Sequence, residues 1–320
     1  MKKIIYIIVI AFTFSVNAQE FKLSPYAQYL MESPFVISPA YAGVTDAHKL
    51  RISGVMQWLG VKNAPHTQVI AYDTRLNEKT GVGAILYNDS NGNTKQMGGQ
   101  LSYAYHLTLE EADESYLSFG LSYKFNHFKI ETGKFDDGQG VGQTDPYVGG
   151  DQTTSNHNFE FGSLYRYKRF FIAINASNIL NKRLKIFDNT EPQKLRNYYA
   201  YAGYVFLSEN DEWEYEPSLF FKYFESDGRN VTDVNFKARK LTDDGYYWAG
   251  INSRFINDQT FKPLSVTPLF GLKKDKLYLG LGYQLNVNES VQFGSYGTPM
   301  LVLGYDFDSG RYRTSWSSRK

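Results

Sequence analysis

The sequence contains no cysteine among its 320 residues, and it also lacks other features that mark common protein classes. Without thiols, neither disulfides nor thiolate metal sites can hold the chain together. Its 34 Lys and Arg residues are balanced by 33 Asp and Glu residues, so there is no basic excess for binding nucleic acid. After the N-terminus, no stretch shows the apolar period of a helix. A large core or a membrane must therefore stabilise the chain.

The one markedly apolar run stands at the N-terminus and is typical of a secretory signal peptide. Lys2 and Lys3 precede an apolar stretch over 4–14, and a small-residue cleavage site ends at Ala18. This stretch is shorter than the ~20 residues of a membrane-spanning helix, although an uncleaved anchor is the alternative. We expect residues 1–18 to be removed and the rest to be exported. Losing both lysines leaves 32 basic against 33 acidic residues, a net charge of −1.

Aromatic residues are abundant, with 26 Tyr and 23 Phe making 17% of the chain together with Trp. Tyrosines beside lipid headgroups are one physical reason for such an excess. Apolar and polar residues also alternate along most of the chain, as in "YLSFGLSYKF" (116–125) and "LYLGLGYQLN" (277–286). A period of two indicates β-strands with one apolar and one polar face. Both a soluble sandwich and a membrane barrel fit this alternation.

Strand length separates the two folds. The predicted strands have about 10 to 15 residues, whereas globular strands have about 5 to 6 and tilted membrane strands ~9–11. About fourteen are predicted, and bacterial single-chain barrels have an even number. They cover 49–59, 65–76, 80–89, 95–109, 114–125, 157–167, 169–178, 196–208, 212–224, 231–241, 246–255, 262–273, 276–287 and 298–308.

The connections between these strands alternate between short and long. The even-numbered ones are short, such as "NEK" and "KD", whereas the odd-numbered ones include 126–156, 179–195 and "SNGNT". Short turns on one rim and long loops on the other are typical of outer-membrane barrels. The sequence thus predicts an all-β transmembrane barrel over residues 49–308. A periplasmic or lumenal segment (19–48) precedes it and a periplasmic tail (309–320) follows it.

No motif predicts catalysis, a cofactor or a metal. The five histidines have no metal-ligand spacing, and no nucleophile elbow is present. The Asp- and Gly-rich stretch 134–151 could hold calcium, but it lacks the ligand pattern of an EF-hand, which favours a solvated loop. We therefore expect no enzyme. Charged residues on the predicted lumenal faces either line a pore or pair with one another; they are Lys124, Arg166, Glu214, Glu216, Lys222 and Arg239.

A proline-flanked stretch before the first strand, "SPFVISPAYAGVTD", belongs to no strand. Pro34 and Pro39 fix the backbone φ angle and remove hydrogen-bond donors, and Gly43 permits a turn. We expect this stretch to lie at the periplasmic mouth or in the lumen. There it would seal the barrel, dock a periplasmic partner, or act only as a structural clasp.

Two motifs in this region, "SPAYAG" (38–43) and "QWLGVKNAPHTQVIAYD" (57–73), resemble the start of the PorP/SprF family of type IX secretion system outer-membrane proteins. Later blocks, such as "PLFGLKKDKLYLGLGYQL" and "GSYGTPMLVLGYDF", extend the resemblance over nearly the whole mature chain. It implies a barrel in the outer membrane that works with the secretion and gliding machinery, contacts periplasmic ring components, and exports or anchors adhesin-type surface proteins. The residues expected to bind partners are Ser38, Pro39, Ala40, Tyr41, Ala42, Gly43, Gln57, Trp58, Gly60, Ala64 and Pro65.

The sequence departs from the family pattern at two places. Val55 stands where members usually carry Arg, and Thr298-Pro299-Met300 stands where they often carry Ser-His-Glu. We also expect the long loop over 128–155 to bind a protein partner. The competing interpretations are a transporter or porin for hydrophobic or small molecules and, less well supported, a soluble exported sandwich.

Overall fold

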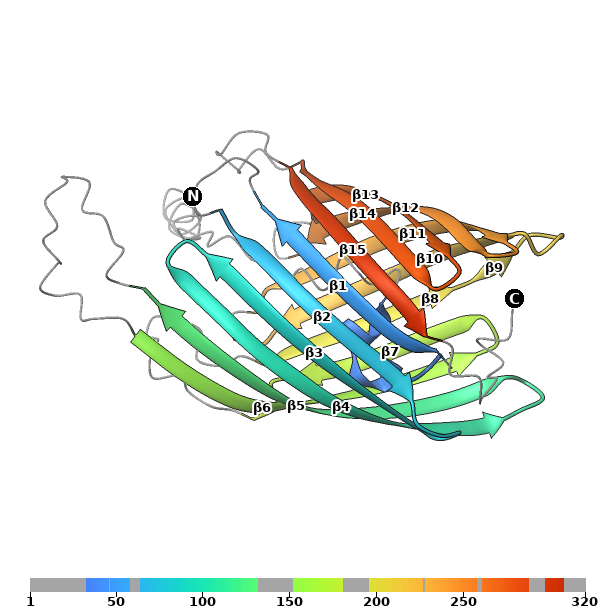
Figure 1. Cartoon of the computed structure of the whole chain (residues 1–320), viewed down its shortest axis with the longest axis horizontal. Helices are drawn as coiled ribbons and strands as arrows, with labels where there is room; N and C mark the ends of the chain where they lie inside the picture. Colours follow the sequence, from blue (N-terminus) through green and yellow to red (C-terminus); the bar gives the residue numbers. More distant parts are fainter. Residues whose placement is uncertain are drawn as a thin grey trace, which may run out of the picture.

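A computed structural model describes residues 33–45, 47–57, 64–131, 152–180, 196–226, 228–257, 261–287 and 297–307. They form one closed antiparallel β-barrel (Figure 1). The strands are β1 (His48–Met56), β2 (His66–Arg75), β3 (Thr80–Asn91), β4 (Thr94–Glu110), β5 (Ser115–Ile130), β6 (Gln152–Tyr167), β7 (Phe170–Ser177), β8 (Asn197–Tyr204), β9 (Phe206–Leu207), β10 (Trp213–Phe224), β11 (Asn230–Thr242), β12 (Gly245–Ile256), β13 (Lys262–Lys274), β14 (Leu277–Asn286) and β15 (Thr298–Phe307).

The wall has fourteen spans, because β8 and β9 lie on either side of Val205 and both pair with β10. Each of these spans pairs with the spans before and after it in the chain, and β1 pairs with β15 to close the ring. Where the strands are paired, their backbone hydrogen bonds are thus made within the protein, as a membrane span requires. The predicted all-β barrel is confirmed. No helix among the described residues is long and apolar enough to cross a bilayer.

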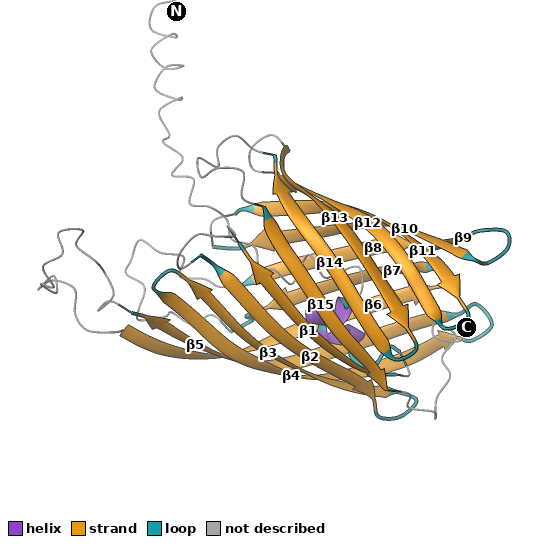
Figure 2. Ribbon diagram, turned by 45° about the horizontal axis from the view of Figure 1, so that its top comes forward, coloured by secondary structure: helices purple, strands orange, loops and turns teal. Residues whose placement is uncertain are grey.

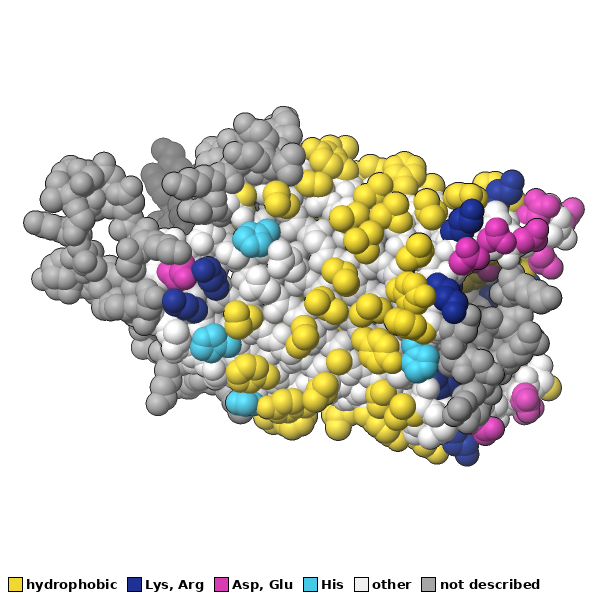
Figure 3. All heavy atoms as spheres, viewed as in Figure 1, with side chains coloured by type: hydrophobic (Ala, Val, Ile, Leu, Met, Phe, Trp, Pro, Cys, Tyr) yellow, Lys and Arg dark blue, Asp and Glu magenta, His cyan; other side chains and the backbone are white. Residues whose placement is uncertain are grey.

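The two faces of the wall differ as predicted. On β5, Phe119, Leu121 and Tyr123 point outward and are exposed, whereas Ser118 and Ser122 point inward and are buried. Figure 3 shows hydrophobic side chains spread over the outer wall and charged ones gathered toward its two ends. A soluble sandwich would bury its apolar faces. The outward apolar band instead fits a wall that faces lipid.

The two rims differ in the length of their connections. One, here called the turn rim, has turns of two to five residues at 76–79, 111–114, 168–169, 208–212, 243–244 and 275–276. The opposite long-loop rim holds the other connections, including those at 131–151 and 178–196. One expected long connection is wrong: only Gly92 and Asn93 join β3 to β4, because most of "SNGNT" is strand. Gly92 has φ +58°, a conformation that glycine adopts without strain.

β5 and β6 are also longer than predicted. Their pairing continues to His127 opposite Ser155 and to Ile130 opposite Gln152, where the sequence suggested loop. Backbone hydrogen bonds do not require apolar side chains. A hairpin can therefore extend beyond the membrane-facing part of its strands, where apolar and polar residues alternate. The predicted partner-binding loop 128–155 thus begins and ends as strand. The stretch 134–151 lies outside the described residues, as do residues 1–32 and the tail from 308.

Candidate functional site

The N-terminal segment 33–45 lies inside the barrel. It contains two short 3₁₀ turns, η2 (Pro34–Val36) and η3 (Pro39–Tyr41), which Figure 2 shows enclosed by the strands. Ala40 and Ala42 are fully buried, and Phe35, Ile37 and Val44 are nearly so. Burying an aliphatic or aromatic side chain of this size contributes about 1.5–3 kcal/mol. The segment is therefore a packed part of the barrel interior, here called the plug.

Local sequence explains the shape of the plug. A proline begins each 3₁₀ turn, where its missing N–H is not needed. The side chain of Ser38 caps the second turn, because its Oγ accepts a hydrogen bond from the Ala40 N–H at 3.3 Å. Gly43 then adopts φ +67°, which redirects the chain toward β1. The proline-flanked stretch is thus built to fold compactly without strand partners.

The barrel wall accommodates the plug through glycines on three strands. A Cβ on Gly81 would overlap the backbone of Ala42, and a Cβ on Gly120 would lie 2.7 Å from the carbonyl oxygen of Pro39. A Cβ on Gly83 would lie 2.7 Å from a ring carbon of Phe35. Real Cβ contacts are not this short, so any larger residue would push the plug or the wall aside. Together with Gly162, which faces Ser38, these glycines are here called the glycine seat.

Polar side chains of the wall hold the backbone of the plug. The Gly43 N–H donates to Asp73 Oδ2 at 3.0 Å, and Asn175 Nδ2 donates to the Ile37 carbonyl at 3.1 Å. His106 Nε2 donates to the Ala42 carbonyl at 3.0 Å, which leaves Nδ1 to accept from Ser118 Oγ at 2.8 Å. A plug without regular secondary structure would otherwise bury unpaired backbone groups. These residues come from β2, β4 and β7, so several parts of the ring hold the plug.

Tyr41 is the one ionisable side chain of the plug, and it is buried. Burial raises the pKa of its hydroxyl far above the ordinary value, and the nearby Glu216 carboxylate raises it further, while Arg166 opposes the shift. The phenol therefore stays neutral at any physiological pH. The ring packs in the buried cluster that contains Phe35 and Ile37.

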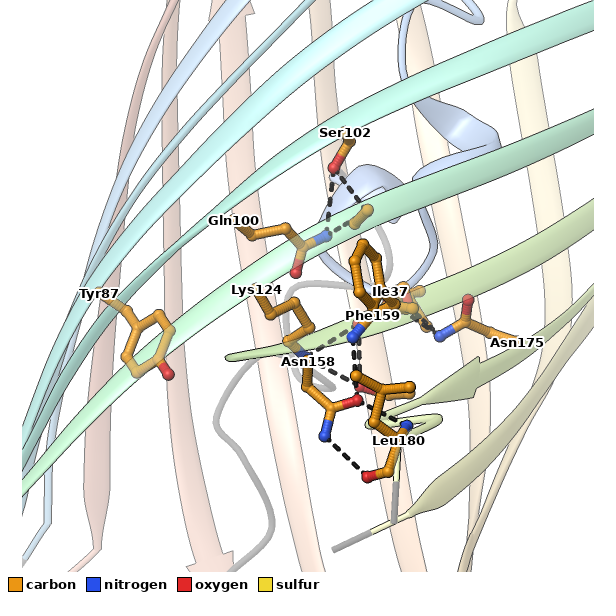
Figure 4. Close-up of polar contacts among 12 residues, drawn as sticks. Ile37, Tyr87, Gln100, Ser102, Lys124, Asn158, Phe159, Asn175 and Leu180 are labelled. Carbon is orange, nitrogen blue, oxygen red and sulfur yellow. Dashed lines mark hydrogen bonds and ion pairs between the residues drawn. The ribbon is translucent and has the colours of Figure 1, made fainter. Parts of the chain in front are cut away.

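A polar network adjoins the plug on the inner faces of β5, β6 and β7 (Figure 4). Glu160 accepts from Lys124 Nζ, from Ser177 Oγ and from Asn175 Nδ2, each at 2.9 Å. Asn175 also holds the plug at Ile37, so the ion pair and the plug share one support. Further along β6, Asn158 binds the backbone of Leu180 through both its amide nitrogen and its amide oxygen.

The six charged residues predicted to face the lumen all do so, and the structure favours pairing over an open charged pore. Lys124 pairs with Glu160 at 2.9 Å, and Arg239 pairs with Glu214 at 2.7 Å. Glu216 pairs with a residue not singled out from the sequence, Lys237, at 3.1 Å. The other two cations lie over aromatic rings: Arg166 over Tyr116 at 5.0 Å and Lys222 over Tyr199 at 5.5 Å. Such compensation is what buried charges require.

The two departures from the family pattern are neighbours in space. Val55 on β1 lies directly opposite Met300 on β15. Both are buried in an apolar cluster with Trp248, Leu269 and Tyr278. A charged residue at position 55 would here lie in an apolar cluster, opposite Met300. Sequence spacing alone could not reveal that the positions meet.

The predicted partner-binding residues fall into two groups. Ser38 to Gly43 form the core of the plug and are all buried. Gln57 and Pro65 join at the long-loop rim, where the Gln57 N–H donates to the Pro65 carbonyl at 2.8 Å, and Ala64 lies beside them. Trp58 and Gly60 lie outside the described residues. The structure therefore does not bring Ser38 to Gly43 together with Gln57, Ala64 and Pro65, and the two motifs meet instead at their other ends, through the hydrogen bond from Gly43 to Asp73.

Sequence reasoning missed the residues that receive the plug. His106 and Asn175 are ordinary inward-facing polar residues of a barrel pattern, and nothing local marks them, whereas Asp73 closes the motif 57–73 but was not among the residues expected to bind. The glycine seat left a faint signal, because Gly120 and Gly162 occupy inward positions within strands, where glycine packs poorly unless another backbone approaches. Among the described residues, no group of three His, Cys, Asp or Glu side chains is placed to bind a metal.

Comparisons with known proteins place this barrel. Its fold is similar to that of the CymD monoaromatic hydrocarbon channel, with a TM-score of 0.52 and 11% identity over 88% of this chain and 92% of that one. The toluene transporter TbuX of Ralstonia pickettii gives 0.51 and 11% over 88% and 93%, and TodX of P. putida gives 0.52 and 9% over 85% and 92%. These identities support the barrel fold alone. No curated protein matches the sequence.

The sequence itself matches the family described as type IX secretion system membrane protein PorP/SprF, over residues 18–305. This match covers the plug and every strand, except the last two residues of β15. The resemblance drawn from the two N-terminal motifs is therefore confirmed over most of the chain. The chain belongs to the PorP/SprF family of type IX secretion system membrane proteins.

Proposed function

We propose that this protein is a non-enzymatic outer-membrane barrel that helps the type IX secretion machinery export or anchor adhesin-type surface proteins. In this role it contacts periplasmic ring components on one side of the membrane and the secreted protein on the other. The membership in the family supports the link to secretion. The outward apolar band supports a place in the lipid bilayer.

The observation that carries the proposal is the occupied interior. The plug packs against the inner wall at the glycine seat, and charged side chains of the inner wall are paired with one another. A barrel whose own backbone is held across its lumen is suited to present its rims to other proteins. We infer that the plug seals the barrel, which is one of the roles that the sequence suggested for Ser38 to Gly43.

The difference between the rims supports an orientation. In outer-membrane barrels the short turns face the periplasm and the long loops face outward. In this orientation β1 begins and β15 ends at the periplasmic rim, which agrees with a chain exported through a cleaved signal peptide. Ring components then meet the turn rim. The connection around Gln57, Ala64 and Pro65 faces outward, where it can contact the secreted protein.

Deleting residues 34–43 tests the proposal. We expect the variant to insert into the membrane, to conduct ions in planar bilayers where the intact barrel does not, and to lower the amount of adhesin on the cell surface. A matched control replaces only exposed turn residues, for example Glu111→Gln. Normal insertion with unchanged surface display and unchanged conductance would contradict the sealing role.

Transport of hydrophobic or small molecules is the alternative function. The similar solved barrels are named as hydrocarbon channels, but identities near 10% carry only the fold to this chain. Uptake of toluene by liposomes that contain the intact, plugged barrel would favour transport. Loss of surface proteins without any change in uptake, after deletion of the gene, would favour the secretion role.

A further inference from the structure

β6 extends well beyond the strand that follows it. Its partner β7 pairs only with the part from Glu160 to Tyr167. On the other side, β5 pairs with β6 along its full length, ending with Ile130 opposite Gln152. Among the described residues, the start of β6 is therefore a strand with one paired edge and one edge that no other strand pairs (Figure 1).

The backbone groups on this open edge can be identified. The N–H and C=O of one strand residue point to the same side, and the side alternates along the strand. The Phe159 carbonyl accepts from the Ile179 N–H at 3.1 Å, so the backbone of Phe159 points to the β7 side. By alternation, Thr153, Ser155 and His157 present their N–H and C=O groups on the open edge. The intervening residues bond to β5.

The open edge lies above the apolar band of the wall. Going up the outer face of β6, Phe161 and Phe159 are exposed aromatic residues, and His157, Ser155 and Thr153 then follow. The neighbouring strand β5 changes in the same way, from Phe125 to His127. Aromatic side chains mark the membrane interface of a barrel. The edge therefore stands in water at the long-loop rim.

Two of the three side chains beside the edge, those of Ser155 and His157, already have partners. His127 Nδ1 lies 2.9 Å from Ser155 Oγ, and the Tyr123 hydroxyl is hydrogen-bonded to His157. Recognition at this edge thus falls to three N–H and three C=O groups of the backbone. An extended polypeptide offers the matching row, because main-chain hydrogen bonds supply the affinity when a strand is added to a sheet.

We propose that the open edge of β6, formed by Thr153, Ser155 and His157, binds an extended strand of the secreted protein by β-augmentation. This rests on the proposed function, which places that protein on the long-loop side. A bare strand edge is a template for another chain, and its position above the lipid excludes the walls of neighbouring barrels. Backbone recognition also tolerates differences in sequence, so the edge can serve clients whose side chains vary.

The test uses proline on the edge. The Ser155 N–H points away from β5, so Ser155→Pro removes an edge donor and blocks the approaching strand while sparing the β5–β6 pairing. Ser155→Ala is the matched control, because it changes the side chain but keeps the N–H. The probe is a purified domain of whichever protein disappears from the cell surface when the barrel gene is deleted, chosen as the domain that binds the unchanged barrel. We expect Ser155→Pro to weaken its binding to the full-length barrel at least tenfold and Ser155→Ala to leave binding within twofold.

Hydrogen exchange resolved by residue supplies the second measurement. In the free barrel the Thr153, Ser155 and His157 amides should exchange fast and the Thr154 and Asn156 amides slowly; the bound domain should protect the first three. Equal binding by both Ser155 variants would overturn the proposal while leaving the secretion role intact. Protection of all five amides in the free monomer, or only in a barrel dimer, would assign the edge to the chain itself or to a second copy and also overturn it. If no surface protein depends on the barrel, the proposed function fails, and this proposal with it.

Discussion

The glycine seat makes a sharp quantitative prediction at Gly120. In Gly120→Ala the new methyl group would lie 2.7 Å from the carbonyl oxygen of Pro39 and closer still to the Ala40 nitrogen. Ordinary contact begins at about 3.4 Å, so the plug backbone must move by roughly 0.7 Å or more, and overpacking of this kind costs about 1–3 kcal/mol. Expelling the plug would expose Phe35, Ile37 and Tyr41, at about 1.5–3 kcal/mol for each apolar side chain. The plug should therefore stay inside but open more often.

The size of this effect follows from the strain. Because each 1.4 kcal/mol is a factor of ten, a cost of 1–3 kcal/mol raises the population of the open plug roughly 5- to 150-fold. The absence of native cysteine permits a clean assay. Ser38→Cys places a single thiol at a side chain that is 1% exposed, and its rate of reaction with a maleimide in detergent micelles reports plug opening.

The control is Gly54→Ala on β1, where an added Cβ would meet nothing within 4 Å. In the Ser38→Cys background, Gly120→Ala should accelerate labelling by the stated factor, and Gly54→Ala should leave the rate unchanged. Equal rates in the two variants would refute the inference that the seat is shaped by the plug. A thiol that already reacts at the rate of an exposed cysteine without either change would refute the buried plug itself.

Three further changes test other contacts. Asp73→Asn keeps the shape of the side chain but weakens the charge-assisted hydrogen bond to Gly43, and hydrogen bonds to charged groups contribute about 1.5–3 kcal/mol. In this background, the thiol of Ser38→Cys should react with the maleimide several-fold faster. An unchanged rate would show that this hydrogen bond does not hold the plug. Arg254 and Asp233 form a buried ion pair joined by two hydrogen bonds of 2.7 Å. In urea unfolding in micelles, Asp233→Asn should destabilise the barrel by about 3–5 kcal/mol, whereas replacing both residues by apolar ones should be nearly neutral. Equal losses of stability in the two variants would contradict the pairing argument. Val55→Arg should destabilise the barrel by a few kcal/mol, because it places a charge in the apolar cluster, and adding Met300→Glu should restore part of the lost stability. A double variant no more stable than Val55→Arg alone would mean that the two side chains do not interact.

The strands were largely predictable from the sequence. Alternation on β5, with Phe119 and Tyr123 on one face and Ser118 and Ser122 on the other, comes from the pleat itself and needs no knowledge of neighbours. The same reasoning located every span and the difference between the rims. The predicted strands ended too early, at Phe125 on β5 and at His157 on β6, because the alternation of side chains marks the band that faces lipid and does not mark where backbone pairing ends.

The plug shows the limit of this reasoning. Two prolines, a capping serine and Gly43 determine by themselves a compact stretch that cannot join a strand. Its place inside the ring depends on Asp73, His106 and Asn175, which are far apart in sequence and converge only when the barrel closes. The meeting of Val55 with Met300 likewise depends on the pairing of the first strand with the last. Local sequence determined which residues face lipid, because the two faces of a strand alternate with a period of two. Ring closure decided which inward residues meet, because it joins strands that no local pattern connects.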